Sequence, residues 1–557
     1  MMQLPSSAPP KAADSRHASS TLLPVPLGRL VASFTTLAVS VAVACGGSGS
    51  SSFNNNGNGG LVGNGNGNGA PSLGGGSSGG GGGSGGGTGG DGGGYVCPSG
   101  LQCDVSCSGG GTTTVTGKVY DPAGKNPLYN VAVYVPATAL SPLPKGVPTG
   151  FDACSCGALF QSGAIVNTTT DVDGSFTLNN VPVGMNVPLV LQVGKWRRSL
   201  KINVNSCATN AQPDKSLTLP GTVAAGDTDN NMPDIAVSTG GADTLECLMR
   251  RIGLPESEYV AGTGKTGHVH VFSGGKASTG THGGGGSIGK PEQTIMPGAP
   301  TSSTDLWASQ AQLMPYDILL LSCEGGETYN AVPASLEAYL NAGGRAFGSH
   351  FHYAWFSGPI GSQQSYSAPT DWGSNLATWT TDQQGGSDPM GGIIDQTLNG
   401  SSAPFSKGVT LAKWLGLVGA LGTAPAPDPA TDLAIAAPRY NATVGPANKP
   451  SQPWITSDKD GIAGQTMYFS FDTPVNAPVP AGGGAPNYCG RAVFSDLHVS
   501  GATNDDTGKP PPSSCQDVDL SPQEKALEFM LFDLSSCVIP DTVTVPTDAG
   551  LPYPPPK

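Results

Sequence analysis

Charged and aromatic residues are scarce in this chain. Of its 557 residues, 12% are charged and 6% are aromatic, and 26 Lys and Arg are outnumbered by 40 Asp and Glu, which gives a net charge of −14. A nucleic-acid partner requires a basic surface that can replace the counterions of the phosphates. The composition therefore argues against nucleic acid as a partner.

The chain also lacks an apolar run long enough to span a membrane in its first part. The run at residues 30–44 (LVASFTTLAVSVAVA) would reach roughly 22 Å as a helix, against about 30 Å for a hydrocarbon core. Basic residues precede it, and the small residues Ala42-Val43-Ala44 lie directly before Cys45. This order is typical of a bacterial lipoprotein signal. We expect residues 1–44 to be a signal peptide and Cys45 to carry the lipid that anchors the protein.

From this signal we expect the protein to be located in the bacterial cell envelope, at the outer membrane or the cell surface. Gly46 follows the cysteine, and an aspartate there would have favoured retention at the inner membrane. Secretion of a cleaved, unlipidated chain is the alternative.

Glycine, in contrast, is abundant, with 84 residues in the chain. Residues 45–95 consist largely of Gly, Ser and Asn, and they cannot bury enough surface to offset the entropy of ordering. We expect this segment to be a disordered tether, and residues 539–557 to be a proline-rich tail.

Eleven cysteines follow Cys45, six in the first half of the chain and five in the second. An oxidising compartment favours disulfides, so the six early cysteines suggest three bridges, although fifteen pairings are open. The later group is odd in number, and Cys323, directly after a buried-strand pattern, is the expected free thiol. A zinc site at Cys103, Cys107, Cys154 and Cys156 is an alternative. The candidate disulfide cysteines are Cys97, Cys103, Cys107, Cys154, Cys156, Cys207, Cys247, Cys489, Cys515 and Cys537.

Residues 113–204 show short stretches of alternating apolar and polar residues between turn signals. Alternation at this spacing predicts an antiparallel β-sandwich. The strings VTGKVYDPAGKNPL from Val115, TDVDGSFTL from Thr170 and VPVG from Val181 resemble the carboxypeptidase regulatory-like domain, a transthyretin-like sandwich. We expect this domain to occupy residues 96–238.

From about residue 240 the pattern changes to alternating helices and strands. The expected helices lie at 241–253, 305–314, 332–344, 407–421 and 521–537, with apolar strands between them. Such alternation predicts a parallel sheet with helices on both faces. The predicted fold class is therefore multidomain, an all-β sandwich followed by a flavodoxin-like, doubly wound α/β domain over residues 240–538.

Two turns of this second domain carry a further resemblance. The strings DILLLSCEGG at 317–326 and GGRAFGSHFH at 343–352 resemble the class I glutamine-amidotransferase-like fold, and more closely its ThuA-like branch. The amidotransferases carry a nucleophilic cysteine on a strained elbow in the second turn, where this chain has His350. Because an imidazole cannot form the required thioester, glutamine hydrolysis is not expected. The string GRAVFSDLHVSG resembles the segment that delivers a catalytic histidine, here His498.

Ligands of doubly wound sheets bind at the carboxyl ends of the strands. We therefore expect Glu324, His350, His352 and His498 to lie in one cleft, as an acid–base site or as ligands of zinc or a similar divalent ion. No other cofactor is expected. One alternative is a Cys323 thiolate activated by His350 or His498.

Another alternative is that these histidines are only hydrogen-bonded side chains of the cleft. Several aromatic residues follow the second turn, and they suit either stacking on sugar rings or packing of the core. They are Tyr353, Trp355, Tyr366 and Trp372.

Two functions remain open at this stage. The first is a non-catalytic binding or structural module of the envelope, directed at carbohydrate or another envelope component. The second is a hydrolase or isomerase that acts on a sugar-like substrate through the His/Glu cleft. The missing nucleophile at residue 350 favours the first.

Overall fold

The computed structural model describes residues 96–150, 154, 156–274, 296–361, 364–381, 389–422, 431–457, 464–479, 481, 486–502, 505 and 509–542. The expected signal peptide, Cys45, the expected tether and most of the expected tail lie outside these ranges. In the described part, no helix combines the length and the apolar character that crossing a membrane would require.

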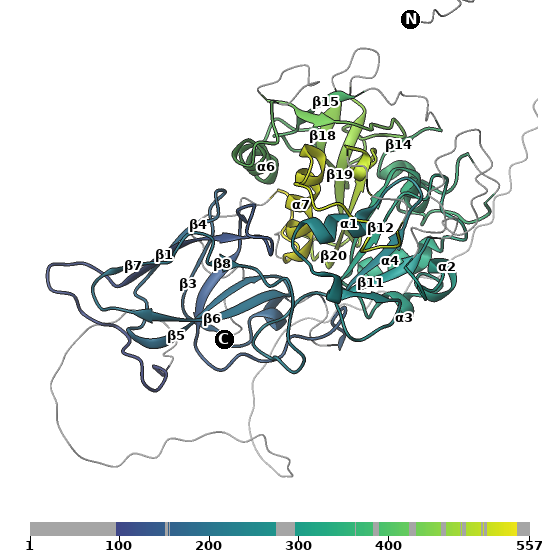
Figure 1. Ribbon diagram of the computed structural model, residues 1–557. Helices are drawn as coiled ribbons and strands as arrows, with labels where there is room; N and C mark the ends of the chain where they lie inside the picture. The colour runs from purple at the N-terminus through teal and green to yellow at the C-terminus, as the bar shows by residue number, and fades with distance from the viewer. Residues whose placement is uncertain are drawn as a thin grey trace, which may run out of the picture. The chain divides into compact units, whose positions relative to one another are not determined.

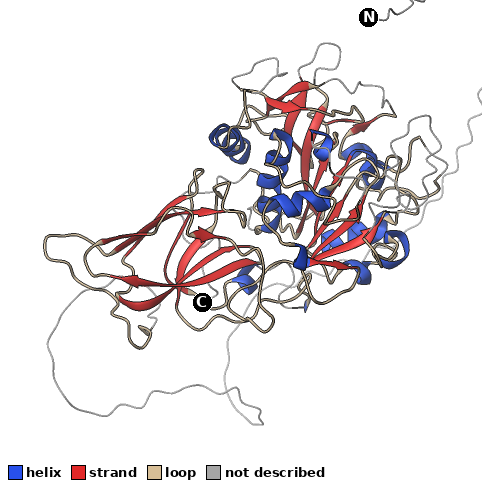
Figure 2. Cartoon of the chain, in the orientation of Figure 1, coloured by secondary structure: helices blue, strands red, loops and turns tan. Residues whose placement is uncertain are grey.

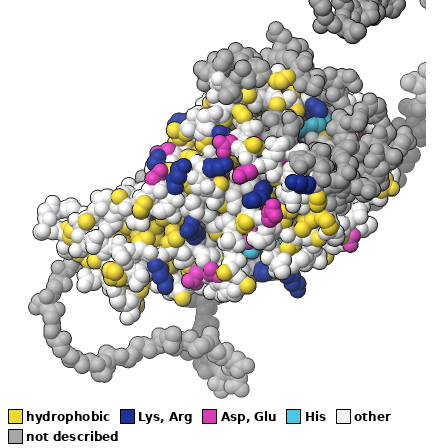
Figure 3. All heavy atoms as spheres, viewed as in Figure 1, with side chains coloured by type: hydrophobic (Ala, Val, Ile, Leu, Met, Phe, Trp, Pro, Cys, Tyr) yellow, Lys and Arg dark blue, Asp and Glu magenta, His cyan; other side chains and the backbone are white. Residues whose placement is uncertain are grey.

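The described chain is mostly β-structure with some helices (Figure 2). The described residues belong to one compact unit. On the face seen in Figure 3, acidic and basic side chains lie scattered among apolar and uncharged ones.

The first half of the described chain forms two four-stranded sheets (Figure 1). Their strands turn apolar side chains, such as Val115, Val133, Leu178 and Leu189, into a shared core. One sheet contains β4 (Ser175–Asn179), β1 (Thr114–Tyr120), β7 (Thr209–Ala211) and β8 (Leu217–Thr218), and the other contains β3 (Ala164–Thr169), β2 (Ala132–Pro136), β5 (Gly184–Val193) and β6 (Trp196–Val204).

The second half is built on one ten-stranded sheet, in the order β10-β11-β9-β12-β13-β20-β19-β18-β15-β16. Its neighbours from β10 to β20 pair in parallel, and those from β20 to β16 pair antiparallel. The bounds are β9 (Ile235–Thr239), β10 (Tyr259–Ala261), β11 (Val269–Ser273), β12 (Ile318–Leu321), β13 (Arg345–Ser349), β15 (Met390–Ile394), β16 (Leu433–Ile435), β18 (Ser451–Ser457), β19 (Thr466–Thr473) and β20 (Gly490–Ser495), and β14 (Thr378–Trp379) pairs with β17 (Ala442–Thr443).

The sheet departs from the expected all-parallel arrangement. A parallel pair needs a long crossover, usually helical, whereas short connections join antiparallel neighbours. The described residues of the connections from β18 to β19 and from β19 to β20 contain no helix, and both pairs are antiparallel. Strand β9 lies in the range 96–238 yet pairs with β11 and β12 in this sheet.

Helices accompany the sheet at most of the expected places. Helix α7 begins with a capping box, in which the Ser521 hydroxyl accepts from Glu524 N and the Glu524 carboxylate accepts from Ser521 N. The expected single helix at 305–314 is wrong, because two short helices flank the buried residues Leu306 and Trp307. The helices are α1 (Leu245–Arg251), α2 (Ser302–Asp305), α3 (Gln310–Leu313), α4 (Pro333–Asn341), α5 (Tyr353–Ser357), α6 (Ser406–Leu417) and α7 (Pro522–Ser535), with 3-10 turns η2 (Cys156–Leu159), η3 (Glu256–Glu258), η5 (His350–His352), η6 (Gly373–Asn375) and η7 (Val499–Ala502).

Disulfide bonds are present, as the cysteine content predicts. They join Cys97 to Cys103, Cys107 to Cys207, Cys154 to Cys489 and Cys247 to Cys515, and Cys537 is also disulfide-bonded. The expectation that the six early cysteines pair among themselves is wrong, because Cys154 pairs with Cys489. The alternative zinc site is wrong too, since oxidation consumes the thiols of Cys103, Cys107 and Cys154.

Helix α7 packs against the first two sheets as well as against the ten-stranded one. Phe529 stacks on Tyr129 and Phe532 contacts Trp196, with ring centroids 6.2 and 5.7 Å apart. These aromatic contacts belong to one core that extends from the first sheets into the second half of the chain. Helix α7 therefore joins the two parts of the described chain through a shared apolar core.

Candidate functional site

Three neighbouring strands end at the candidate site. Strands β12, β13 and β20 are adjacent and parallel, so their carboxyl ends meet at one edge of the sheet. Cys323 follows β12, His350 follows β13 directly, and His498 follows β20. The sheet therefore brings together three residues that are far apart in the sequence.

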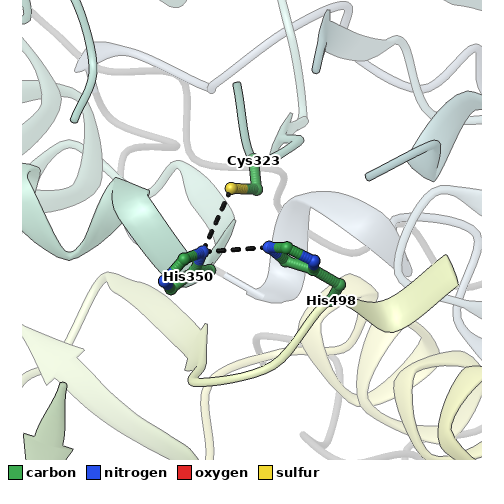
Figure 4. A group of neighbouring side chains, drawn as sticks. All are labelled: Cys323, His350 and His498. Carbon is green, nitrogen blue, oxygen red and sulfur yellow. Dashed lines mark hydrogen bonds between the residues drawn. The ribbon is translucent and has the colours of Figure 1, made fainter. Parts of the chain in front are cut away.

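The three side chains point toward one another (Figure 4). Nδ1 of His350 lies 2.9 Å from Nε2 of His498 and 3.4 Å from Sγ of Cys323. All three ligand atoms lie within 4.8 Å of one another. Cys323 is fully buried, and His350 and His498 are 2% and 6% exposed. We refer to Cys323, His350 and His498 as the thiol–imidazole cluster.

His350 stands on a strained turn. Its φ of 44° lies in the left-handed region, which a residue other than glycine enters at a cost of about 1–2 kcal/mol. Cys323, which follows the neighbouring strand β12, is held beside this turn because its backbone N–H donates to Ser349 Oγ over 3.0 Å. The strain is thus located at the residue that makes both cluster contacts.

The backbone around His498 is anchored from two sides. Asp243 accepts hydrogen bonds from the backbone N–H groups of Val499 and Ser500, at 2.9 and 2.8 Å. Gln523 of α7 donates to the carbonyl of His498 over 2.6 Å. These contacts hold the imidazole in place although it follows the end of β20.

The hydrogen bonds assign the tautomers of both rings. Arg439 Nη2 lies 3.3 Å from His498 Nδ1, and because a guanidinium can only donate, this nitrogen is the acceptor. The neutral His498 ring then carries its proton on Nε2 and donates to His350 Nδ1. His350 in turn carries its proton on Nε2, which is buried and has no hydrogen-bond partner among the described residues.

Burial keeps Cys323 and His350 uncharged. It raises the pKa of the Cys323 thiol to about 12. It also lowers the pKa of His350 well below 6.5, and the nearby His498 acts in the same direction. At neutral pH the cluster therefore consists of a thiol and a neutral His350 imidazole with a lone pair on Nδ1.

The other two predicted members lie apart from the cluster. His352 Nδ1 is 2.8 Å from Thr328 Oγ1, and its Nε2 is 2.8 Å from the carbonyl oxygen of Ser322. Glu324 is fully buried and packs closely against Gly274. A Cβ atom at residue 274 would lie only 3.1 Å from Cγ of Glu324. The group of metal-ligating atoms at this edge contains neither residue.

The aromatic residues after the second turn belong mainly to the core. Tyr353 and Trp355 are fully buried and Trp372 is 1% exposed, so they offer no open face to a sugar ring. Tyr366 is half-buried, and its hydroxyl donates to the carbonyl of Thr328. The three buried rings therefore pack in the core and are not placed for stacking on a sugar.

Sequence reasoning missed two residues beside the cluster, Arg439 and Asn441. Both lie in the segment between β16 and β17, which has no regular pattern that would place them. The nearby Asp496 accepts from the backbone N–H groups of Asn441 and Ala442, at 2.5 and 2.8 Å, so it positions this segment. Burial raises the pKa of Asp496 to about 7.

No family model, no curated protein and no solved structure matches the chain.

Proposed function

We propose that this chain is a lipid-anchored envelope hydrolase, with a regulatory-like β-sandwich and a ThuA-like domain whose thiol–imidazole cluster carries the chemistry on a sugar-like substrate. The observation that carries the proposal is the convergence of Cys323, His350 and His498 at the ends of three adjacent strands. Residues from separate strand ends are the usual source of catalytic groups in folds built on parallel sheets.

The strained turn at His350 supports a chemical role over a structural one. Backbone strain persists where the surroundings enforce it, and it collects at active sites and ligand clamps. If His350 only filled space, a glycine or an asparagine at residue 350 would adopt the positive φ at a lower cost and would make the folded protein more stable. Because the nearby aromatic rings pack in the core, the proposal rests on the cluster and not on stacking against a sugar ring.

The cluster differs from that of the amidotransferases in where the thiol stands. Those enzymes place it on the elbow, whereas here the elbow holds His350 and the thiol comes from the neighbouring strand β12. A neutral imidazole beside a second imidazole suits general acid–base catalysis of water attack. The same exchange removes the thioester route, so glutamine hydrolysis is not proposed.

Hydrolysis can be tested with the full-length chain purified in mild detergent. We expect cleavage of a substrate from a panel of p-nitrophenyl glycosides and esters, and loss of at least about 100-fold in kcat/KM in His350→Ala and His498→Ala. The matched control is His268→Ala, because His268 directly precedes β11 and contacts Glu258 instead of the cluster. Equal rates in all four proteins, or no cleavage by the wild type, would contradict the proposal.

The proposed lipid anchor at Cys45 can be tested separately. Metabolic labelling with a palmitate analogue should modify the wild-type chain and should fail in Cys45→Ala. Labelling of both chains, or of neither, would contradict the lipid anchor.

A further inference from the structure

We infer that the thiol–imidazole cluster binds one zinc-type divalent cation, with Sγ of Cys323, Nδ1 of His350 and Nε2 of His498 as its protein ligands. The inference deepens the proposed function and rests on it for the role of the ion, whereas binding itself follows from the geometry of the three side chains.

The spacing of the three atoms suits a tetrahedral ion. With bond lengths of about 2.0–2.1 Å to nitrogen and 2.3 Å to sulfur, tetrahedral ligands lie roughly 3.3 Å apart for two nitrogens and 3.6 Å apart for nitrogen and sulfur. The observed separations are 2.9 and 3.4 Å. Small side-chain rotations would therefore bring the three atoms around one ion.

The surroundings of His350 favour this assignment. Its Nε2 is buried without a hydrogen-bond partner among the described residues, and so is Oδ1 of Asn441, whose side chain interacts with the same ring. Asn441 Nδ2 donates to the carbonyl of Thr380 over 2.8 Å, which leaves the amide oxygen as the free acceptor. A proton on Nε2 directed at this oxygen leaves the Nδ1 lone pair for the ion, and metal-bound histidines usually donate their other N–H in this way.

Arg439 opposes binding in the present arrangement. Ligation through Nε2 places the proton of His498 on Nδ1, where it would face the Nη2 donor of Arg439 at 3.3 Å. Arg439 is half-buried, and its guanidinium also donates from Nη1 to the carbonyl of Pro438. The guanidinium must therefore turn away when the ion enters, so the structure predicts that removing it tightens binding.

Charge and protons balance simply. Binding of M²⁺ forms one bond to sulfur and two to nitrogen, and the thiol releases one proton to solvent, which leaves a net charge of +1 on the complex. Three protein ligands leave the fourth position for a water molecule, the arrangement found in catalytic rather than structural zinc sites. Under the proposed function, such an ion would take over the activation of water from the two imidazoles that bind it, because it would lower the pKa of that water.

Binding can be measured on the full-length chain in mild detergent, first stripped with a chelator. Titration with Co²⁺ should produce the intense visible bands of a tetrahedral ion and a near-ultraviolet cobalt–thiolate band, both saturating at one ion per chain. Competition with Zn²⁺ should abolish both signals. Absence of the thiolate band in the wild type would overturn the inference without any variant.

The variants divide into three groups with different expected outcomes. Cys323→Ser and His498→Ala should each weaken Co²⁺ binding by more than roughly 100-fold, and Asn441→Leu by roughly 10- to 100-fold. Arg439→Ala should tighten it by roughly two- to fivefold, since a partly exposed charge is worth little more. The control His268→Ala should leave it unchanged.

Among the variants, two results would contradict the inference. One is wild-type affinity in Cys323→Ser, and the other is weakened binding in Arg439→Ala. Far-ultraviolet circular dichroism shows which variants fold, and Arg439→Ala remains informative if a ligand variant does not.

The inference and the proposed function can fail separately. One bound ion without cleavage of any panel substrate would keep the metal site and remove the hydrolase. Cleavage that survives the chelator, with no cobalt–thiolate band, would keep the hydrolase and remove the metal.

Discussion

Asn126 donates from its side-chain amide to Oε2 of Glu528 over 2.7 Å, although 402 residues separate the two in the sequence. The bond joins the turn after β1 to helix α7, and both side chains are buried. Asp121 lies beside the same carboxyl group and accepts from the backbone N–H of Lys125. Two acidic groups therefore share a buried site where the first sheets meet α7.

This acidic pair predicts a dependence of stability on pH. Burial, and then the nearby Asp121, raise the pKa of Glu528 well above 4.5. A raised folded-state pKa gives stability that is complete below the unfolded-state value and is lost as the pH rises through the folded-state value. The wild type should therefore lose stability above about pH 4.5, and Glu528→Gln should lose about 1–3 kcal/mol less between pH 4 and pH 8.

Urea unfolding at pH 4, 6 and 8 measures this difference, with Glu256→Gln as the exposed control. Parallel pH profiles of Glu528→Gln and the wild type would contradict the shared site.

Arg491 should be among the most sensitive positions for stability. Its guanidinium is 2% exposed and contacts Asp472, Asp533 and Asp541 at 2.6, 2.8 and 2.8 Å. Removing the cation leaves the buried Asp472 without its partner and leaves the half-buried Asp533 and Asp541 with Lys407 alone, so Arg491→Ala should lower the free energy of unfolding by about 3–5 kcal/mol. Thermal and urea unfolding measure the loss.

The matched control is the exposed pair of Lys118 and Asp173, whose side chains are 44% and 35% exposed. Lys118→Ala should change the stability by less than about 1 kcal/mol. Similar effects of the two substitutions would show that Arg491 does not carry the buried network.

Two substitutions of His350 separate backbone strain from chemistry. Asparagine tolerates positive φ, whereas a β-branched residue does not, so His350→Asn should be more stable than His350→Val by about 1–2 kcal/mol. Both should lose the activity and the metal signal. Denaturant unfolding orders the two proteins, and equal stability would mean that the turn relaxes.

Cys323 should be unreactive in the folded protein. The side chain is fully buried and its pKa is raised to about 12, so little of the reactive thiolate forms at pH 8. Iodoacetamide should leave the Cys323 peptide unmodified in the native chain and alkylate it fully in denaturant. Mass spectrometry of the digest gives the answer, and rapid native alkylation would contradict the burial.

The sequence predicts the strand ends of the site better than the directions of its side chains. Buried apolar runs place Cys323 and His350 at the ends of β12 and β13, and the structure has both strands there. His350 and His352 would share a face only if the strand continued, but the η5 turn begins at His350. The alternation therefore ends there, and His352 contacts Thr328 instead of joining the cluster.

Other parts of the fold depend on information that local patterns do not hold. Strand β9 is a fully buried run of five residues without alternation, so nothing in it indicates which sheet it joins. Arg439 and Asn441 reach the cluster because Asp496 holds their segment, a contact made across 55 residues. Such placements follow from tertiary packing and cannot be read from spacing.

The disulfide connectivity has a consequence for how the chain matures. Under the proposed export from the N-terminus into an oxidising compartment, Cys107 and Cys154 would meet before Cys207 and Cys489 have emerged. The native partners are nevertheless Cys207 for Cys107 and Cys489 for Cys154. Oxidation in order of arrival would thus trap wrong pairs, and a thiol–disulfide isomerase would be needed to reshuffle them. Yields of active protein should then depend more on the isomerase of the host than on its oxidant.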